Sequence, residues 1–219
     1  MPEMYPGPLG CSLIGDALSR RVWELSVIDL RGFGIGIHQT VDDTPAGGGA
    51  GMVLKPDVVD AAVASAKATS PDATLIHFSP RGERLSQPLL RELSHTNLIL
   101  LCGRYEAVDE RVLEKHQPRE VSLGDFVLTG GDIPAMALID GCVRLLPGVV
   151  GKEASLGEES FGDGAYANLL EYPHYTKPTR WEGRDIPEVL LSGHHANVEK
   201  WRLEQARAIT RARRPDLLK

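Results

Sequence analysis

The stretch that decides the fold runs from Leu98 to Pro134 and reads LILLCGRYEAVDERVLEKHQPREVSLGDFVLTGGDIP. Two apolar runs, residues 97–102 and 126–128, each lead into a glycine turn, at residues 103–106 and 129–132. Glycine at the end of a strand is typical of ligand sites in α/β proteins, because the missing Cβ lets a small molecule lie against backbone amides. The stretch therefore predicts two strands and a ligand site where they end.

Strand-like and helix-like segments alternate on both sides of this stretch. Strands are predicted at residues 22–30, 74–78, 98–102 and 126–128. Helices are predicted from Pro56 onward, over residues 89–93, over residues 108–115, and from Asp132 as N-cap to residue 146. This β/α alternation predicts an α/β fold with a parallel sheet.

The C-terminal part has a different composition. Residues 152–178 are rich in Glu, Gly, Ser and Pro, which predicts a long loop or linker. Residues 189–191 predict a short strand, and Asn197 is the predicted cap of a last helix ending near Arg211. Residues 200–219 hold seven basic and two acidic side chains, so their net charge is +5 in a chain of net charge −6. Such a segment is either a solvated helix face or a surface for a polyanion, and the basic, aromatic residues 175–181 favour nucleic acid.

Composition excludes several classes of protein. With 219 residues, 42% of them hydrophobic, the chain is predicted to form one large soluble domain with a smaller appendage. It has no apolar run of eighteen residues and no signal-peptide pattern, so we expect a cytoplasmic protein without a membrane partner. Cys11, Cys102 and Cys142 are predicted to be buried, reduced thiols. The seven histidines show no metal-ligand spacing, so no metal site is predicted.

Two other glycine-rich segments have features of nucleotide-binding loops. The run Gly32-Phe33-Gly34-Ile35-Gly36 looks like a Rossmann turn, but the helix that this motif requires does not follow. Residues 47–51 lack the Lys-Ser/Thr ending of a phosphate loop, so they are either a flexible surface loop or a loop that approaches a substrate. A third glycine turn, Ser79-Pro80-Arg81-Gly82, follows the predicted strand 74–78. His77, just before this turn, is the histidine most suited to a role in the site.

Together, the glycine turns resemble those of the bacterial tRNA (guanine-N1)-methyltransferases of the SPOUT class. The resemblance is carried by residues 101–111 and 122–136, and in the same order by residues 40–43, 47–49, 79–82, 147–149, 171–176 and 189–193. It implies a deep trefoil-knotted α/β domain and a homodimer whose active site lies at the subunit interface. It also implies three parts: residues 1–152 as the knotted domain, residues 153–178 as a flexible linker with the catalytic carboxylate, and residues 179–219 as a small, mostly helical, basic tRNA-binding domain.

The resemblance implies S-adenosylmethionine as cofactor, and leaves a role for Mg²⁺ open. This donor has no phosphate, so backbone amides and apolar walls suffice to bind it. The residues that match the cofactor pocket are Pro80, Gly82, Gly103, Tyr105, Glu106, Leu123, Gly124, Asp125, Phe126, Val127, Leu128, Gly130, Gly131 and Pro134.

The implied reaction is methyl transfer to N1 of the guanosine immediately 3′ of the anticodon. It needs a base for the N1 proton and a cation or amide for charge on O6. The matching residues are Glu159, where the family commonly has aspartate, and Arg144, which could instead be a surface residue paired with Asp140. Because glutamate is longer by a methylene, Glu158 and Asp163 remain alternatives for the base. A non-catalytic RNA-binding protein and a SPOUT enzyme for another RNA site are the alternative functions.

Two further departures from the family pattern are visible. Ala46 and Ala50 flank the triple glycine, where the family usually has an aromatic residue and a proline, so a looser loop is expected. A strand that family members have upstream of residues 2–6 is absent, so either the true start lies further upstream or the chain lacks one core strand.

Overall fold

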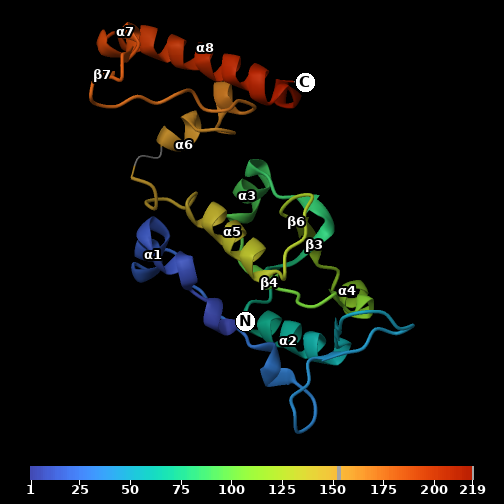
Figure 1. Ribbon diagram of the computed structural model, residues 1–219. Helices are drawn as coiled ribbons and strands as arrows, with labels where there is room; N and C mark the ends of the chain where they lie inside the picture. The colour runs from blue at the N-terminus through green and yellow to red at the C-terminus, as the bar shows by residue number, and fades with distance from the viewer. Residues whose placement is uncertain (152–153, 219) are drawn as a thin grey trace. The chain divides into compact units, whose positions relative to one another are not determined.

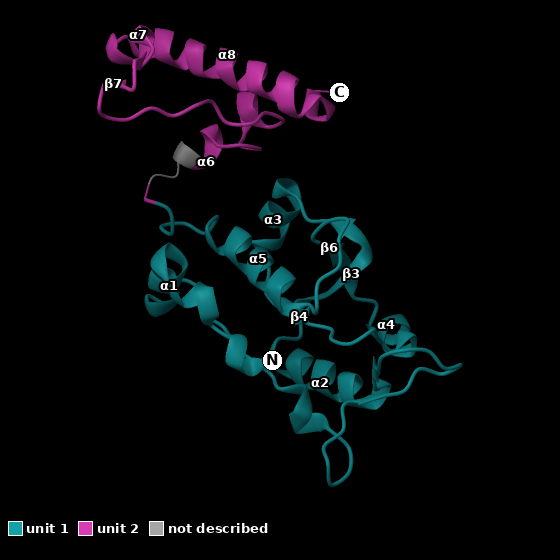
Figure 2. Ribbon diagram, viewed as in Figure 1, with its two compact units in different colours: residues 1–150 teal, residues 151–219 magenta. Residues whose placement is uncertain are grey.

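The computed structural model describes residues 1–151 and 154–218, and it divides into two compact units (Figure 2). Unit 1 comprises Met1–Val150 and unit 2 comprises Gly151–Lys219. Residues 152 and 153, where the knotted domain and the linker were expected to meet, lie outside the described residues. No helix in the described ranges is long and apolar enough to cross a membrane.

A parallel sheet forms the centre of unit 1 (Figure 1). Strand β3 (Thr74–Arg84) lies between β4 (Leu98–Leu101) and β6 (Arg119–Ser122), and it is parallel to both. Helix α3 (Gln87–Leu93) joins β3 to β4, and α4 (Glu110–His116) lies between β4 and β6. The predicted α/β fold with a parallel sheet is therefore confirmed, and all three strands end at the same edge.

Helix α5 (Asp132–Val143) packs against the sheet and against α3. Ile76 of β3, Val121 of β6 and Leu138 of α5 are fully buried in this cluster. The predicted helix is confirmed, but it begins one residue earlier than expected, with Gly131 as its N-cap. The carboxylate of Asp132 does not cap the helix because it pairs with Arg104 instead.

A second hydrophobic cluster lies under α2 (Pro56–Thr69). Proline at the first helical position fixes its start, as predicted, and Val59 and Val63 face the cluster. The same cluster includes residues of β2 (Val53–Leu54), β4, β5 (Ala107–Val108) and α4. Strand β2 pairs with β1 (Asp42–Asp43) and with β5, so it links the glycine-rich loop 45–51 to the chain beyond β4.

A third cluster joins the other face of α5 to the N-terminal segment. The N-terminal segment consists of the short 3-10 helices η1 (Pro2–Met4) and η2 (Gly7–Gly10) and the helix α1 (Ser12–Ser19). Leu9 and Ile14 of this segment pack against Met136 of α5. The strand predicted over residues 22–30 is wrong: the segment has no regular structure until the 3-10 helix η3 (Leu30–Phe33). Val27 and Ile28 are exposed, and the segment pairs with no strand in the part of the chain that the structure describes.

The strand predicted at residues 126–128 is also wrong. The third strand is β6, whose Val121 and Ser122 are buried, whereas Phe126, Val127 and Leu128 are exposed by 54%, 85% and 41% in a loop. An apolar run has no period that distinguishes a buried strand from an exposed binding loop. The helix predicted over residues 108–115 is confirmed as α4, which is capped by the Asp109 side chain.

Unit 2 is built around one long helix, α8 (His195–Arg213). The last helix is thus confirmed, but its N-cap is His194 and not Asn197. The strand predicted at residues 189–191 is wrong, because this run forms the short helix α7 (Glu188–Leu191). Strands β7 (Arg180–Trp181) and β8 (Arg184–Asp185) form a small hairpin.

The segment that precedes the hairpin packs on α8. It contains α6 (Ala154–Glu158) and the 3-10 helix η4 (Gly164–Tyr166), where the sequence predicted only a loop. Tyr166, Leu169 and Tyr172 form a cluster with Ala206 of α8, and the Leu170 amide donates to Thr210 Oγ1 at 2.8 Å. That residues 153–178 act as a linker stays a prediction.

Candidate functional site

The glycine turns after β4 and β6 are joined in one structure. The Gly131 amide donates to the Gly103 carbonyl at 2.9 Å, and Arg104 and Gly130 form an antiparallel bridge. A Cβ on Gly131 would lie 2.8 Å from Cys102 Cα and 3.1 Å from the Gly103 amide nitrogen. Because any side chain there would push the turns apart, only glycine permits this contact.

A charged pair fixes the same two turns. Arg104 places Nη2 2.7 Å and Nε 3.0 Å from Oδ2 of Asp132, whose side chain is only 2% exposed. A buried carboxylate needs such a partner, since an unpaired charge is costly inside a protein. Neither residue was among the predicted site residues, although each lies in a predicted glycine turn.

The third predicted turn belongs to strand β3. Phe78 and Glu83 both pair with Val121, so residues 79–82, including Pro80 and Gly82, form a bulge between them. Since His77 pairs with Leu101, this bulge and the turn 103–106 follow neighbouring parallel strands at the same edge. The strand register therefore places the three predicted segments at one edge of the sheet, with the turns 103–106 and 129–132 in direct contact.

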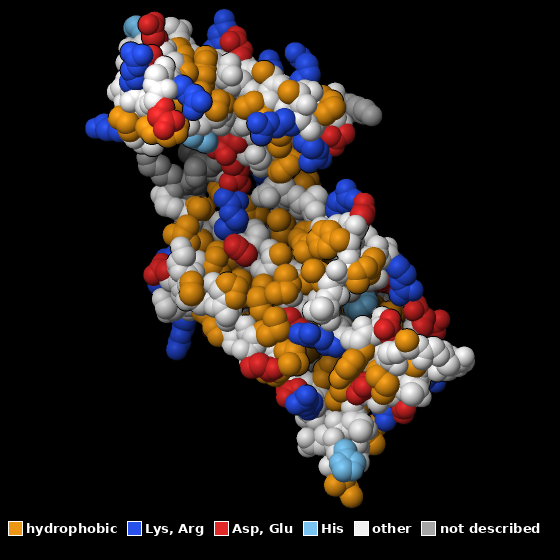
Figure 3. Space-filling model, viewed as in Figure 1, with side chains coloured by type: hydrophobic (Ala, Val, Ile, Leu, Met, Phe, Trp, Pro, Cys, Tyr) orange, Lys and Arg blue, Asp and Glu red, His pale blue; other side chains and the backbone are white. Residues whose placement is uncertain are grey.

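Large apolar side chains are exposed at this edge. Tyr105 is exposed by 56% and has a φ of +60°, and it joins the exposed Phe126, Val127 and Leu128. In the same loop the Ser122 hydroxyl donates to the Gly124 carbonyl, and Asp125 pairs with Arg84. Figure 3 shows apolar side chains gathered on the visible face of unit 1. Contiguous exposed apolar groups are typical of surfaces that bind a ligand or another protein.

The glycine-rich loop 45–51 approaches this edge. The Glu106 amide donates to the Met52 carbonyl at 3.0 Å, and a Cβ on Gly51 would clash with the Glu106 side chain. Of the two interpretations of this loop, the contact favours one that approaches a substrate.

His77 lies beneath the turn that follows β4. Its side chain is 7% exposed, and its Cε1 lies 3.4 Å from the position of a Cβ on Gly103. Nδ1 makes no hydrogen bond with the residues that the structure describes. Burial lowers the pKa of His77 below its ordinary value, and the nearby Glu120 charge only partly opposes this effect. The imidazole is therefore held neutral.

Arg144 lies away from the glycine turns of its own chain. It is the C-cap of α5, whereas Pro134 and the turns lie at the N-terminal end of that helix. Twelve helical residues span about 18 Å, which is far beyond the reach of an arginine side chain. Its backbone amide donates to the Asp140 carbonyl at 3.1 Å, as in a helix end.

The candidate carboxylates are in unit 2. Glu159 follows α6, and its carbonyl accepts from the Gly162 amide at 2.9 Å in a tight turn. Glu158 accepts from the Tyr172 hydroxyl at 3.0 Å and lies 3.3 Å from Arg202 Nη1. Asp163 is the N-cap residue of η4. Glu158 thus connects α6 to α8.

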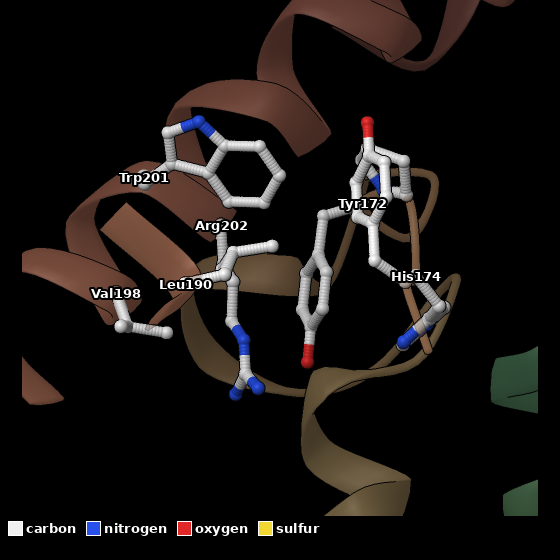
Figure 4. Close-up of a pocket in the computed structure, with 8 residues that line it drawn as sticks. Tyr172, His174, Leu190, Val198, Trp201 and Arg202 are labelled. Carbon is white, nitrogen blue, oxygen red and sulfur yellow. The ribbon is translucent and has the colours of Figure 1, made fainter. Parts of the chain in front are cut away.

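Unit 2 also has an aromatic hollow that motif analysis did not find (Figure 4). It lies between the segment 172–175 and helices α7 and α8. Tyr175 belongs to the basic, aromatic stretch 175–181 that favoured nucleic acid. Arg202 places its guanidinium carbon 4.8 Å from the centre of the Tyr172 ring. Trp181 in the hairpin is 57% exposed, with Arg184 above its ring. In the described ranges no three His, Cys, Asp or Glu side chains are grouped as a metal site.

Comparison with known proteins gives one consistent result. The family model for tRNA (Guanine-1)-methyltransferase TrmD matches residues 1–219. The chain is 58% identical to the tRNA (guanine-N(1)-)-methyltransferase of Ruegeria pomeroyi and 54% identical to that of Rhodospirillum rubrum, over 99% of this chain and 88% of each relative. It is 53% identical to the Gluconobacter oxydans protein of the same name, over 99% of this chain and 91% of the relative.

Proposed function

The chain belongs to the tRNA (guanine-1)-methyltransferase family, and from that membership we propose how its residues carry out the reaction. It is an enzyme that methylates N1 of the guanosine 3′ of the anticodon, at tRNA position 37. The observation that carries the proposal is the joining of the glycine turns at one sheet edge, where Gly131 donates to Gly103. The ends of parallel strands are where α/β enzymes bind their ligands.

The residues of this edge fit a methyl donor, and we propose that the donor is S-adenosylmethionine. The turns offer backbone amides and exposed apolar side chains, with Tyr105, Phe126 and Val127 among them, and this combination suits a nucleoside without phosphates. The wider pocket would comprise the matched residues Pro80, Gly82, Gly103, Tyr105, Glu106, Leu123, Gly124, Asp125, Phe126, Val127, Leu128, Gly130, Gly131 and Pro134. When bound there, the donor supplies a methyl group on a positively charged sulfur, which leaves as a neutral thioether.

We assign the proton transfer to Glu159. Guanine N1 carries a proton at neutral pH, and its lone pair becomes nucleophilic only as that proton leaves. The carboxylate of Glu159 takes this proton while N1 forms its bond to the methyl carbon. Support for Glu159 comes from the family membership, since Glu159 matches the position of the catalytic carboxylate in the resemblance described above.

We assign to Arg144 the stabilisation of negative charge on guanine O6. Within one chain, Arg144 lies about 18 Å along α5 from the glycine turns, so it cannot serve a donor bound at its own turns. This separation supports a homodimer in which Arg144 completes the site of the partner subunit. The exposed apolar edge supports the same conclusion, because a second subunit would cover part of it.

We further propose that residues 1–152 form the deep trefoil knot of the SPOUT class. Residues 153–178 would act as the linker that carries Glu159, and residues 179–219 would bind tRNA through their basic side chains. The parallel sheet and the family membership support this organisation. Because tRNA is used in translation, we place the enzyme in the cytoplasm.

The experiment that tests the function uses donor labelled in its methyl group and two tRNA transcripts. One transcript has guanosine at position 37 and the other has adenosine there. We expect label on N1 of the guanosine in the first transcript and none in the second. Label in neither transcript would overturn the proposed activity, and equal label in both would move it to another RNA site.

A further inference from the structure

We propose that the aromatic hollow of unit 2 takes one unstacked nucleobase from the anticodon loop, next to the guanosine that is methylated. This inference rests on the proposed function, since it needs tRNA as substrate. The hollow has a volume of about 180 Å³. Its lining residues are Tyr172, Pro173, His174, Tyr175, Leu190, Val198, Trp201 and Arg202.

The size and walls of the hollow suit a single base. Pockets for drug-sized ligands start at about 300 Å³, so a hollow of 180 Å³ accepts only a small planar group. Tyr175 and Trp201 have ring centres 6.3 Å apart, and Tyr175 is 48% exposed. Exposed aromatic faces of this kind stack with bases of single-stranded RNA.

Arg202 adds a polar group with an unmet hydrogen bond. Its guanidinium lies against the Tyr172 ring, and Nη1 lies 3.3 Å from Glu158. Its Nε is buried and has no partner among the residues that the structure describes. Arg202 lines the hollow and its side chain is 38% exposed, so its terminal N–H groups can donate to an acceptor in the hollow. Base edges and phosphates provide such acceptors.

Unit 2 also has exposed cations on α8, which lines the hollow, and in the segment that follows Tyr175. Arg180 in the hairpin and Lys200 on α8 have side chains exposed by 71% and 78%, and Lys177 and Arg184 are also exposed. Basic side chains beside stacking aromatics are the combination that binds single-stranded nucleic acid. The target guanosine must leave its stack to react, which also frees the neighbouring bases. These features favour a tRNA base over a peptide.

The test combines a protein variant with base-deleted tRNA. Tyr175→Ala removes one wall, Tyr175→Phe keeps it, and Leu191→Ala changes an exposed apolar side chain of α7 outside the hollow. Dissociation constants are measured for the intact transcript and for transcripts that each lack one base of the anticodon loop other than that of position 37. We expect Tyr175→Ala to bind the intact transcript about 5- to 150-fold more weakly, with Tyr175→Phe and Leu191→Ala close to wild type.

Coupling between the two changes identifies the bound base. The affinity of the wild type for tRNA should fall by a similar factor when one particular base is missing from the transcript. The affinity of Tyr175→Ala should not fall further when that same base is missing. If the losses of affinity from Tyr175→Ala and from the base deletion multiply for every base of the loop, the hollow does not hold a base. The same conclusion follows if Tyr175→Ala binds the intact transcript as tightly as Tyr175→Phe. Methyl transfer by the wild type in the same preparation separates this failure from failure of the proposed function, and melting curves show that each variant is folded.

Discussion

Arg104 and Asp132 form an ion pair across the two glycine turns, with Nη2 2.7 Å from Oδ2 and the carboxylate 2% exposed. Arg104→Met should cost up to about 3 kcal/mol, because the buried Asp132 carboxylate then keeps only the N-terminal ammonium group, 3.4 Å from Oδ1, as a charged partner. Arg84→Ala breaks an exposed pair with Asp125 and should cost less than about 1 kcal/mol. Urea unfolding of both variants checks the difference. Equal costs would show that the buried pair does not hold the turns.

Gly131 permits the close approach of the same turns. In Gly131→Ala the new Cβ would meet the Cys102 backbone at 2.8 Å, so the turns must separate. We expect a loss of about 1–3 kcal/mol in stability and a weaker affinity for the methyl donor, measured by calorimetry. Gly32→Ala is the matched control, because nothing lies within 4 Å of its Cβ position. Unchanged donor affinity in Gly131→Ala would contradict the placement of the donor at these turns.

Regular periodicity made the core elements predictable. The helix after Pro56 and the helix from Asp132 bury residues at helical spacing, and the β/α alternation was sufficient to predict the parallel sheet. The apolar run at residues 126–128 failed as a strand because hydrophobicity does not distinguish a residue buried in the core from one exposed for a ligand or a partner. The true strand, β6, has only one apolar residue, Val121, among its four.

The site was predictable only in its local parts. Each glycine turn could be recognised from its own sequence. The Arg104–Asp132 pair joins residues 28 positions apart, and the hollow joins Tyr172 to Trp201. Such contacts depend on the tertiary fold, for which no spacing rule exists in a single sequence. The distance of Arg144 from the turns likewise follows only from the observed length of α5 and from the position of Arg144 at its C-terminal end.

Stability should depend on pH through His77. Burial lowers its pKa in the folded state from 6.5, so below about pH 6.5 the unfolded chain binds more protons and stability falls as the pH decreases. His77→Gln should therefore flatten the slope of melting temperature against pH between about pH 7 and pH 5. His95→Gln, at an exposed position, should keep the wild-type slope. An unchanged slope in His77→Gln would show that this imidazole is not held neutral.

Substitution of Glu159 should lower catalysis, whereas substitution of Glu158 should lower stability. Glu159→Gln removes the proposed base and should lower kcat about 10²- to 10⁴-fold, with donor affinity nearly unchanged. Glu158→Gln weakens the contacts with Tyr172 and Arg202 and should mainly lower the melting temperature. Single-turnover methyl transfer and thermal melting separate these effects. If Glu158→Gln abolishes turnover in a folded protein and Glu159→Gln does not, the assignment of the base is reversed.

Mixed dimers test whether Arg144 serves the glycine turns of the partner subunit. At a donor concentration too low to fill the weakened site of Gly131→Ala, Gly131→Ala and Arg144→Ala should each be nearly inactive as homodimers. A mixed dimer contains one Gly131→Ala subunit and one Arg144→Ala subunit. If each active centre combines the turns of one subunit with the arginine of the other, one centre has both substitutions and the other has neither. Random re-association produces half mixed dimers with one working centre each, so about a quarter of wild-type activity should return. If both groups came from the same chain, every centre would carry one defect and no activity would return. Sedimentation of the mixture verifies that subunits have exchanged, so that lack of recovery can be attributed to the geometry of the site.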